Sequence, residues 1–296
     1  MSDSLAKLRR KITSATDLQS VVRTMKTLAA SSIGQYEQSV LALSNYYRTV
    51  ERGLGVCFRQ AAATTELPAQ PATTEHGING IVVFGSDQGL VGQFNDVITA
   101  HALETLGKLT GKNRVWAVGE RVHASLTDAG ITPAGLFSVP ASVQAITPLV
   151  WEILVQSEPP QGADRMVALY LCYNQPVAHT GFAPVSQRLL PLDEAWRHQL
   201  ASRAWPTQNL PEVIGNHDTT LRALIREYLS VSIFRACAES LASENASRLA
   251  AMQRADKNID ALLDTLKGNF HRLRQDGIDE ELFDVITGFE ALNKPL

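Results

Sequence analysis

The chain has 296 residues, of which 45% are apolar and 19% charged, and its formal net charge is -3. This composition is that of a folded globular protein with one large domain or two smaller ones. The charge balance excludes the chain-wide basic surface that is typical of nucleic-acid-binding proteins. The cysteines (Cys57, Cys172 and Cys237) are odd in number and form no CxxC pair, which favours reduced thiols in a cytosolic compartment.

No stretch is apolar for long enough to span a bilayer, and the N-terminus lacks the apolar segment of a signal peptide. Periodic helix begins almost at once, which argues against an organelle transit sequence. We therefore expect a bacterial cytosolic protein with no direct membrane insertion.

Residues 1–58 repeat apolar side chains at a spacing of seven. A seam sustained over this length predicts a coiled-coil helix rather than an ordinary surface helix. The first series is apolar throughout, and the second is interrupted at two polar positions. The series are Leu8, Ala15, Val22, Ala29, Tyr36, Leu43 and Val50, and Ile12, Gln19, Lys26, Ile33, Val40, Tyr47 and Leu54.

Residues 59–77 lose this period and are rich in Ala, Thr and Pro, which is typical of a linker. Within residues 78–192, apolar runs at 81–84, 115–118 and 166–173 alternate with helical stretches near 95–109 and 142–156. Strand, helix and strand at this spacing predict a small Rossmann-like parallel-sheet domain. Residues 193–218 show no clear period, so we expect an irregular connection with at most a short helical piece.

Residues 219–292 return to the seven-residue spacing and predict a second long helix. Two long apolar seams are unfavourable when exposed to water, so we expect the terminal helices to pack against each other. Because the α/β domain lies between them in the sequence, they can run antiparallel. The predicted fold is an α/β domain plus a long antiparallel coiled coil. The seam series are Leu221, Tyr228, Arg235, Ala242, Leu249, Asp256, Leu263 and Phe270, and Leu224, Val231, Ala238, Asn245, Met252, Ile259, Leu266 and Leu273.

The stretch SDQGLVGQFN, residues 86–95, follows an apolar run where α/β proteins often bind phosphate. A Walker loop needs a lysine after its second glycine, and Gln93 stands there. The glycine spacing also differs from that of a dinucleotide loop. The better interpretation is a tight strand-to-helix turn, with Asn95 or Asp96 capping the helix.

No catalytic, cofactor or metal motif stands out elsewhere. Ser86 lacks the flanking glycine of a nucleophile elbow, since Phe84 precedes it by two. The histidines have no metal-ligand spacing. Residues 276–290 carry six acids and no base, namely Asp276, Asp279, Glu280, Glu281, Asp284 and Glu290, and solvated charge is the better interpretation. The basic N-terminal segment fits either nucleic acid or an acidic protein partner.

Four motifs in register give the chain a resemblance to one family, the gamma subunits of F-type ATP synthases. KITSATDLQSVVRTMKTLAAS is similar to R-I-x-S-V-x-x-T-x-x-I-T-x-A-M-x-x-V-A-A-S, and SDQGLVGQFN to S-D-R-G-L-C-G-x-x-N. SENASRLAAMQRADKNIDALL resembles S-E-x-A-A-R-M-x-A-M-x-x-A-T-x-N-A-x-x-L-I. NFHRLRQDGIDEELFDVITGFEAL resembles N-x-x-R-Q-x-x-I-T-x-E-x-x-E-I-x-x-G-A-x-A-L. Order and spacing hold from about residue 5 to 292.

The chain departs from these patterns at several positions, which indicates a divergent branch. Gln88 and Val91 stand in place of the loop arginine and cysteine, and Gly277 falls within the expected helix at a cost of about 1 kcal/mol relative to Ala. The other departures are Val22, Ser32, Asp279 and Phe289.

The resemblance implies a non-catalytic rotor shaft without cofactor or metal. Its coiled coil would turn inside a ring of three alpha and three beta subunits, and its α/β domain would lie against the epsilon subunit and the membrane c-ring. It would sit peripherally at the cytoplasmic face of the bacterial inner membrane. Nucleic acid is not among the implied partners.

The resemblance also implies partner contacts, which we expect at named positions. The N-terminal bases would face acidic loops of beta, and the terminal arginine and glutamine would bond to a beta loop. The expected contact residues are Arg9, Arg10, Lys11, Arg23, Met25, Lys26, Arg248, Arg254, Asn269, Arg274, Gln275 and Glu281. The fingerprint residues of the α/β domain are Ser86, Asp87, Gly89, Gly92 and Asn95.

Two other classes remain open on the residues alone. A free-standing α/β enzyme or ligand-binding protein with a coiled-coil dimerisation arm would form its site around SDQGLVGQFN. A coiled-coil scaffold for nucleic acid would show salt-dependent binding to DNA or RNA.

Overall fold

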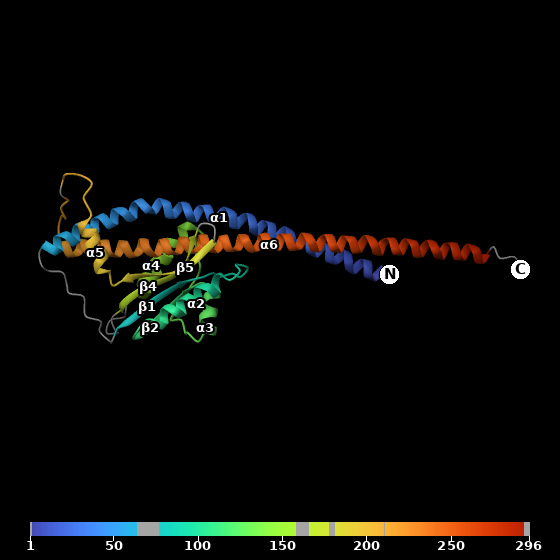
Figure 1. The fold of residues 1–296 in the computed structure, drawn as a ribbon, viewed down its shortest axis with the longest axis horizontal. Helices are drawn as coiled ribbons and strands as arrows, with labels where there is room; N and C mark the ends of the chain where they lie inside the picture. Colours follow the sequence, from blue (N-terminus) through green and yellow to red (C-terminus); the bar gives the residue numbers. More distant parts are fainter. Residues whose placement is uncertain (1, 64–76, 158–165, 178–180, 210, 293–296) are drawn as a thin grey trace. The chain divides into compact units, whose positions relative to one another are not determined.

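The computed structural model describes residues 2–63, 77–157, 166–177, 181–209 and 211–292 (Figure 1). It divides into two compact units. The terminal unit comprises Met1–Ala29 and Leu249–Leu296, and the sheet unit comprises Ala30–Arg248. Two long helices contribute to both units.

The elements follow one another along the chain in the order that Figure 1 colours from blue to red. They are α1 (Ser2–Ala63), β1 (Ile78–Phe84), α2 (Phe94–Gly107), β2 (Lys112–Val118), α3 (Glu120–Asp128), β3 (Gly135–Phe137), η1 (Val143–Ala145), α4 (Ile146–Ser157), β4 (Met166–Val177), β5 (Gly181–Leu190), α5 (Glu194–Ser202) and α6 (His217–Leu292).

The sheet has the strand order β3-β2-β1-β4-β5. β1 pairs in parallel with both β2 and β4, and β2 with β3, which confirms the predicted parallel sheet. The antiparallel edge strand β5 was missed. Its residues mix Gly, Pro and polar side chains, and several of them are partly exposed, so no apolar run marks it.

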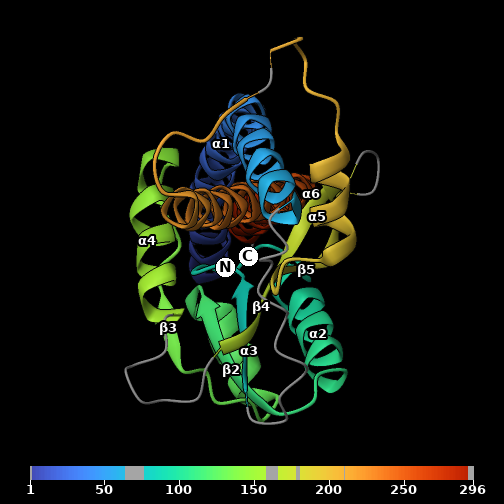
Figure 2. The same cartoon turned by 90° about the vertical axis from the view of Figure 1, so that its left-hand side faces the viewer.

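Successive side chains of a strand point to opposite faces of the sheet. Both faces are therefore apolar, and helices cover each of them. Ile81 and Val83 pack with α2 and α3 on one face. Val82 and Phe84 pack on the other face with α4 and with the stretches of α1 and α6 that belong to the sheet unit. Figure 2 shows the sheet end-on between α2 and α3 and these other helices.

Within the sheet unit, α1 and α6 run antiparallel. Tyr46 Oη donates a hydrogen bond of 2.8 Å to Glu227, and the rings of Tyr47 and Tyr228 lie 5.9 Å apart. Further along α1, the carbonyl of Cys57 is 3.0 Å from His217 Nε2, so the contacts on α6 move backward as those on α1 advance.

Helix α5 forms within residues 193–218, where the sequence predicts an irregular connection with a short helical piece. Asp193 caps it by accepting a hydrogen bond from the backbone of Ala195. The half-buried Trp196 packs against Phe58 and Tyr228, and Leu200 is buried in the same cluster, which explains why the short helix is stable here. Gly55 allows the close approach, because a Cβ there would lie 2.6 Å from the carbonyl oxygen of Leu200.

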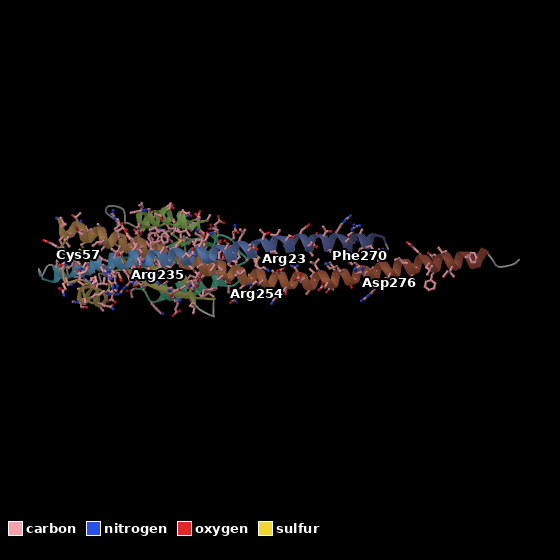
Figure 3. All side chains as sticks on the ribbon, turned by 90° about the horizontal axis from the view of Figure 1, so that it is seen from above. Arg23, Cys57, Arg235, Arg254, Phe270 and Asp276 are labelled. Atoms are coloured by element: carbon pink, nitrogen blue, oxygen red, sulfur yellow. The ribbon has the colours of Figure 1, made fainter. Side chains whose placement is uncertain are left out.

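In the terminal unit, the predicted seam residues form a small core. Ala15 and Val22 of α1 are buried with Met252, Ile259 and Leu263 of α6. Figure 3 shows α6 continuing past Asp276 with no α1 beside it.

The element boundaries differ from the expected ones at a few residues. Residues 59–63 continue α1, although we had placed them in the linker, and α6 begins at His217 rather than at residue 219. Residues 64–76, the rest of the expected linker apart from Gly77, lie outside the described residues.

Candidate functional site

The fingerprint loop, residues 86–92, leaves the carboxyl end of β1 and leads into α2. Ser86 is fully buried and bonded to Asn95 in both directions. Its backbone N–H donates to Asn95 Oδ1 at 3.0 Å, and Asn95 Nδ2 donates to Ser86 Oγ at 2.8 Å. Asn95 therefore ties the loop to α2 and does not cap that helix. The residue at the N-cap, Gln93, makes no capping hydrogen bond with its side chain, so the predicted cap by Asn95 or Asp96 is wrong.

Asp87 joins the loop to two further segments of the sheet unit. One carboxylate oxygen accepts the backbone N–H of Glu120 at 3.0 Å, at the start of α3. The other accepts the backbone N–H of Val139 at 2.9 Å, just after β3. A carboxylate at a helix N-terminus is favourable. Ser86 and Asp87 therefore have a structural role: they anchor the fingerprint loop to α2, to α3 and to the segment after β3.

The glycines of the loop have different roles. Gly92 has φ of 60°, in the left-handed region, as a tight turn requires. Gly89 does not, and a Cβ there would make only ordinary contact, 3.6 Å from Arg121. Leu90 adopts φ of 63° without being glycine, and its side chain is 63% exposed.

Helix α6 lies against the crevice where open α/β sheets place their ligands. That crevice is at the carboxyl ends of strands on either side of a change in strand order, here β1 and β4. Ser247 Oγ of α6 donates to the Val91 carbonyl at 2.5 Å, and Gln175 near the end of β4 donates to Glu239 of α6 at 3.1 Å. The chain's own helix thus occupies the position that a nucleotide takes in binding proteins of this fold class.

Buried charges accompany these contacts. Glu244 and Arg248, one turn apart on α6, form an ion pair of 2.7 Å with side chains only 6% and 14% exposed. Burial raises the pKa of Glu244, Arg248 opposes this shift and Asp87 adds to it. Arg248, expected to contact a partner, is instead paired within the chain.

In the terminal unit, the polar interruptions of the two seams meet one another. Asp256 accepts Lys26 Nζ at 2.8 Å, Arg23 Nε at 3.0 Å and Gln19 Nε2 at 3.4 Å. Gln19 also bonds to Asp260. We name Gln19, Arg23, Lys26 and Asp256 the seam cluster. The bond from Lys26 and the charge of Arg23 hold the pKa of Asp256 below its usual range.

The expected contact residues are thus distributed over several surfaces. Arg23 and Lys26 serve the seam cluster, and Met25 packs beside the core of the terminal unit. The remaining expected residues are exposed along the helices: Arg9, Arg10, Lys11, Arg254, Asn269, Arg274, Gln275 and Glu281.

The sequence interpretation missed an apolar surface on the last part of α6. These residues lie within the acidic stretch that we interpreted as solvated charge. The signal was present, since large apolar side chains recur among the acids. The exposed residues are Ile278, Leu282, Phe283, Val285, Ile286 and Phe289. Exposed apolar surface of this extent is typical of a protein interaction site.

Other candidate sites are weaker. A groove of about 320 Å³ is lined by Val40, Leu41, Glu37, Gln175 and Glu239 among others, but Glu239 is already paired with Arg235 and Gln175. Over the described part of the chain, no three His, Cys, Asp or Glu side chains are grouped to hold a metal. In the same residues, no helix is long and apolar enough to cross a membrane.

Comparison with known proteins decides the family. A family model described as ATP synthase matches residues 4–292. Proteins named ATP synthase gamma chain match over nearly the whole length. The one from Moorella thermoacetica is 26% identical, covering 96% of this chain and 98% of its own, and the one from Leifsonia xyli subsp. xyli is 28% identical, covering 99% of both. The chain belongs to the ATP synthase gamma family.

The fold agrees with this membership. A chain in a solved structure of the Euglena gracilis mitochondrial ATP synthase (OSCP, F1 and c-ring) has a similar fold, with a TM-score of 0.63. It is 16% identical and covers 100% of this chain and 98% of its own. Gamma subunits are non-catalytic rotor subunits, peripheral to the membrane, and the catalytic sites lie on the beta subunits. The predicted family, fold class and non-catalytic role are therefore confirmed.

Gly119 offers a test of the fingerprint anchor. It has φ of 114°, and a Cβ there would lie 2.7 Å from the Ser86 carbonyl oxygen. We expect Gly119→Ala to lower the free energy of unfolding by about 1–3 kcal/mol, measured by urea denaturation of the full chain. The matched Gly89→Ala should change it by less than about 0.5 kcal/mol. Equal effects of the two substitutions would contradict this account.

The seam cluster predicts a specific pH dependence. Because the folded-state pKa of Asp256 is lowered, its contribution is present above the unfolded pKa of about 3.9 and is lost as pH falls through the folded value. We expect the melting temperature of the unmodified chain to fall as the pH is lowered from about 5 to 2. In Asp256→Asn and in Lys26→Met, this fall should be smaller. Lys11→Met, at an exposed position on the same helix, is the control. The same fall in both cluster variants as in the unmodified chain would refute the assignment.

Proposed function

We propose that this chain is the central stalk of a membrane-bound F-type ATP synthase, and that its rotation couples ion translocation to ATP synthesis or hydrolysis on the alpha/beta ring. The observation that carries this proposal is the family match over residues 4–292 of a chain whose terminal helices run antiparallel. A shaft must resist bending, and long paired helices supply that stiffness.

Coupling requires that the stalk contact the three beta subunits unequally. A ligand shifts a conformational equilibrium only by its differential affinity for the states. The terminal unit offers unequal surfaces: exposed bases at Arg9, Arg10 and Lys11 on α1, and the apolar surface from Ile278 to Phe289 on α6. Basic side chains that face acidic loops attract them more strongly in some orientations than in others, without forming one permanent binding site.

The partners follow from the same proposal. Three alpha and three beta subunits would surround the helices, and the epsilon subunit and the c-ring would bind the sheet unit. The relative from Euglena gracilis comes from an assembly with F1 and a c-ring, which supports this arrangement. The chain would act peripherally at the cytoplasmic face of a bacterial inner membrane.

The individual contact residues form a narrower part of the proposal. Arg274 and Gln275, exposed on α6, would bond to a loop of beta. The exposed residues Arg254, Asn269 and Glu281 would add polar contacts along the same helix. Arg23, Lys26, Met25 and Arg248 would act mainly by supporting the stalk, because their side chains are engaged within the chain.

Co-purification tests the assembly directly. We expect the chain, tagged in its own host, to be recovered with alpha and beta subunits and with ATPase activity. Recovery of the chain alone, with binding of a small ligand, would favour the free-standing α/β protein instead. Salt-dependent binding to DNA or RNA without ATPase subunits would favour the nucleic-acid scaffold.

The double substitution Arg274→Ala, Gln275→Ala tests the beta contact. Losing hydrogen bonds from one charged and one neutral donor should cost about 2 kcal/mol or more, so we expect coupled ATP synthesis in membranes to fall by about tenfold or more. Assembly should be retained, because both side chains are exposed.

Asp276→Ala is the control, because Asp276 is exposed and points about 200° away from Arg274 and about 100° away from Gln275 around the helix. It should leave synthesis close to that of the unmodified chain. Unchanged synthesis and hydrolysis in the double variant would remove Arg274 and Gln275 from the proposed contact while leaving the assembly result intact.

A further inference from the structure

We propose that Ser247, supported by the Glu244–Arg248 pair, is a positioning residue that latches the fingerprint loop to α6, so that the sheet domain turns together with the helix. This inference rests on the proposed function, since a latch of this kind matters only in a chain that transmits torque. All of its contacts lie within the sheet unit.

The central contact is the hydrogen bond from Ser247 Oγ to the Val91 carbonyl oxygen, at 2.5 Å. Val91 is 2% exposed, so its carbonyl has little access to water. When a buried carbonyl loses its hydrogen-bond partner, the folded state is destabilised by the full desolvation free energy of that carbonyl. The contact therefore favours one fixed position of the loop on α6.

The ion pair beside Ser247 supports this position. Glu244, Ser247 and Arg248 have the i, i+3, i+4 spacing that places side chains on one face of a helix. Glu244 Oε2 and Arg248 Nε are buried and have no hydrogen-bond partner among the described residues. Buried pairs of this kind contribute little to stability, and apolar residues often replace them without loss. Their presence here is better explained by orientation: the carboxylate fixes the long Arg248 side chain on the face of α6 that carries Ser247.

The groups that face Glu244 come from each neighbouring element. They are Arg248 of α6, Asp87 of the fingerprint loop, and Tyr36 of α1, whose pKa is raised by burial with contributions from Cys237 and Glu244. Asp87 in turn holds the starts of α3 and of the segment after β3. A continuous series of contacts thus runs from α6 through Val91 and Asp87 into the sheet domain.

The experiment uses Val91→Cys as a reporter of latch opening. The natural cysteines Cys57, Cys172 and Cys237 are buried, so a chain without the reporter gives a low background of maleimide labelling. With the latch intact, Cys at position 91 should react slowly. Adding Ser247→Ala should raise the labelling rate about fivefold, as expected for a lost neutral hydrogen bond. Adding Glu244→Gln should raise it by a smaller factor, because Glu244 bonds to Arg248 on α6 and not to the loop itself.

Two control variants separate the latch from general loosening. Ser230→Ala removes a hydroxyl of the same helix that bonds only to the carbonyl of Arg226, and it should leave labelling unchanged. Ser247→Thr keeps the hydroxyl and should restore protection. Hydrogen–deuterium exchange of residues 86–92 in the Ser247→Ala chain without the reporter gives the same reading if Val91→Cys disturbs the fold.

The functional readout is ATP-driven ion pumping per ATP hydrolysed in membranes that contain the assembled enzyme. We expect this ratio to fall in Ser247→Ala and Glu244→Gln and to be unchanged in Ser230→Ala. Unchanged labelling and exchange in the latch variants would overturn the proposal, and so would a loosened loop with an unchanged pumping ratio. Failure of the unmodified chain to assemble with alpha and beta would instead refute the proposed function, whatever the labelling shows.

Discussion

The structure depends above all on one constraint: the apolar seams of α1 and α6 must be removed from water. Each large aliphatic residue that is fully buried in such a seam contributes about 1.5–3 kcal/mol. Val22 meets Met252 and Ile259 in the terminal unit, and Tyr36 and Val50 are buried in the sheet unit. Because the two helices come from opposite ends of the chain, the elements from β1 to α5 form an insertion between them. The sheet domain then uses α1 and α6 as the cover for one of its own faces.

A wholly apolar seam would allow the helices to slide by a heptad, since every register would bury similar side chains. The seam cluster opposes this in the terminal unit. Asp256 finds three donors in one register, and a slip would leave its carboxylate without them at a cost. In the sheet unit, Ser247 and the Glu244–Arg248 pair act similarly against the fingerprint loop. Polar groups in apolar surroundings thus supply the specificity that apolar burial alone does not.

The sequence predicted the parts of this fold that depend on periodic patterns. The seam positions, the strands at 81–84 and 115–118 and the antiparallel pairing needed only spacing and the cost of exposed apolar surface. Other features depend on contacts between distant residues, and these were not predictable. β5 is stabilised by pairing with β4, and α5 by the burial of Leu200 and the packing of Trp196 against Tyr228. The partners of Arg23 and Lys26 lie more than two hundred residues away at Asp256, so the bases appeared to be free for a partner. The apolar side chains near Phe283 were obscured by the acids around them.

The fingerprint loop shows how an α/β fold that often binds nucleotides is used in a non-catalytic subunit. In this family the catalytic sites lie on the beta subunits. In a nucleotide-binding α/β protein, the crevice between β1 and β4 would stay open, and the loop amides would face phosphate. Here Ser247 of α6 bonds to the loop at Val91, and the side chains of Ser86 and Asp87 are directed to Asn95, α3 and the segment after β3. The same strand-to-helix turn that could bind a ligand binds the chain's own helix instead. A scaffold built for binding is thereby converted into a joint, and a joint is what a rotating subunit requires between its shaft and the domain that the shaft must turn.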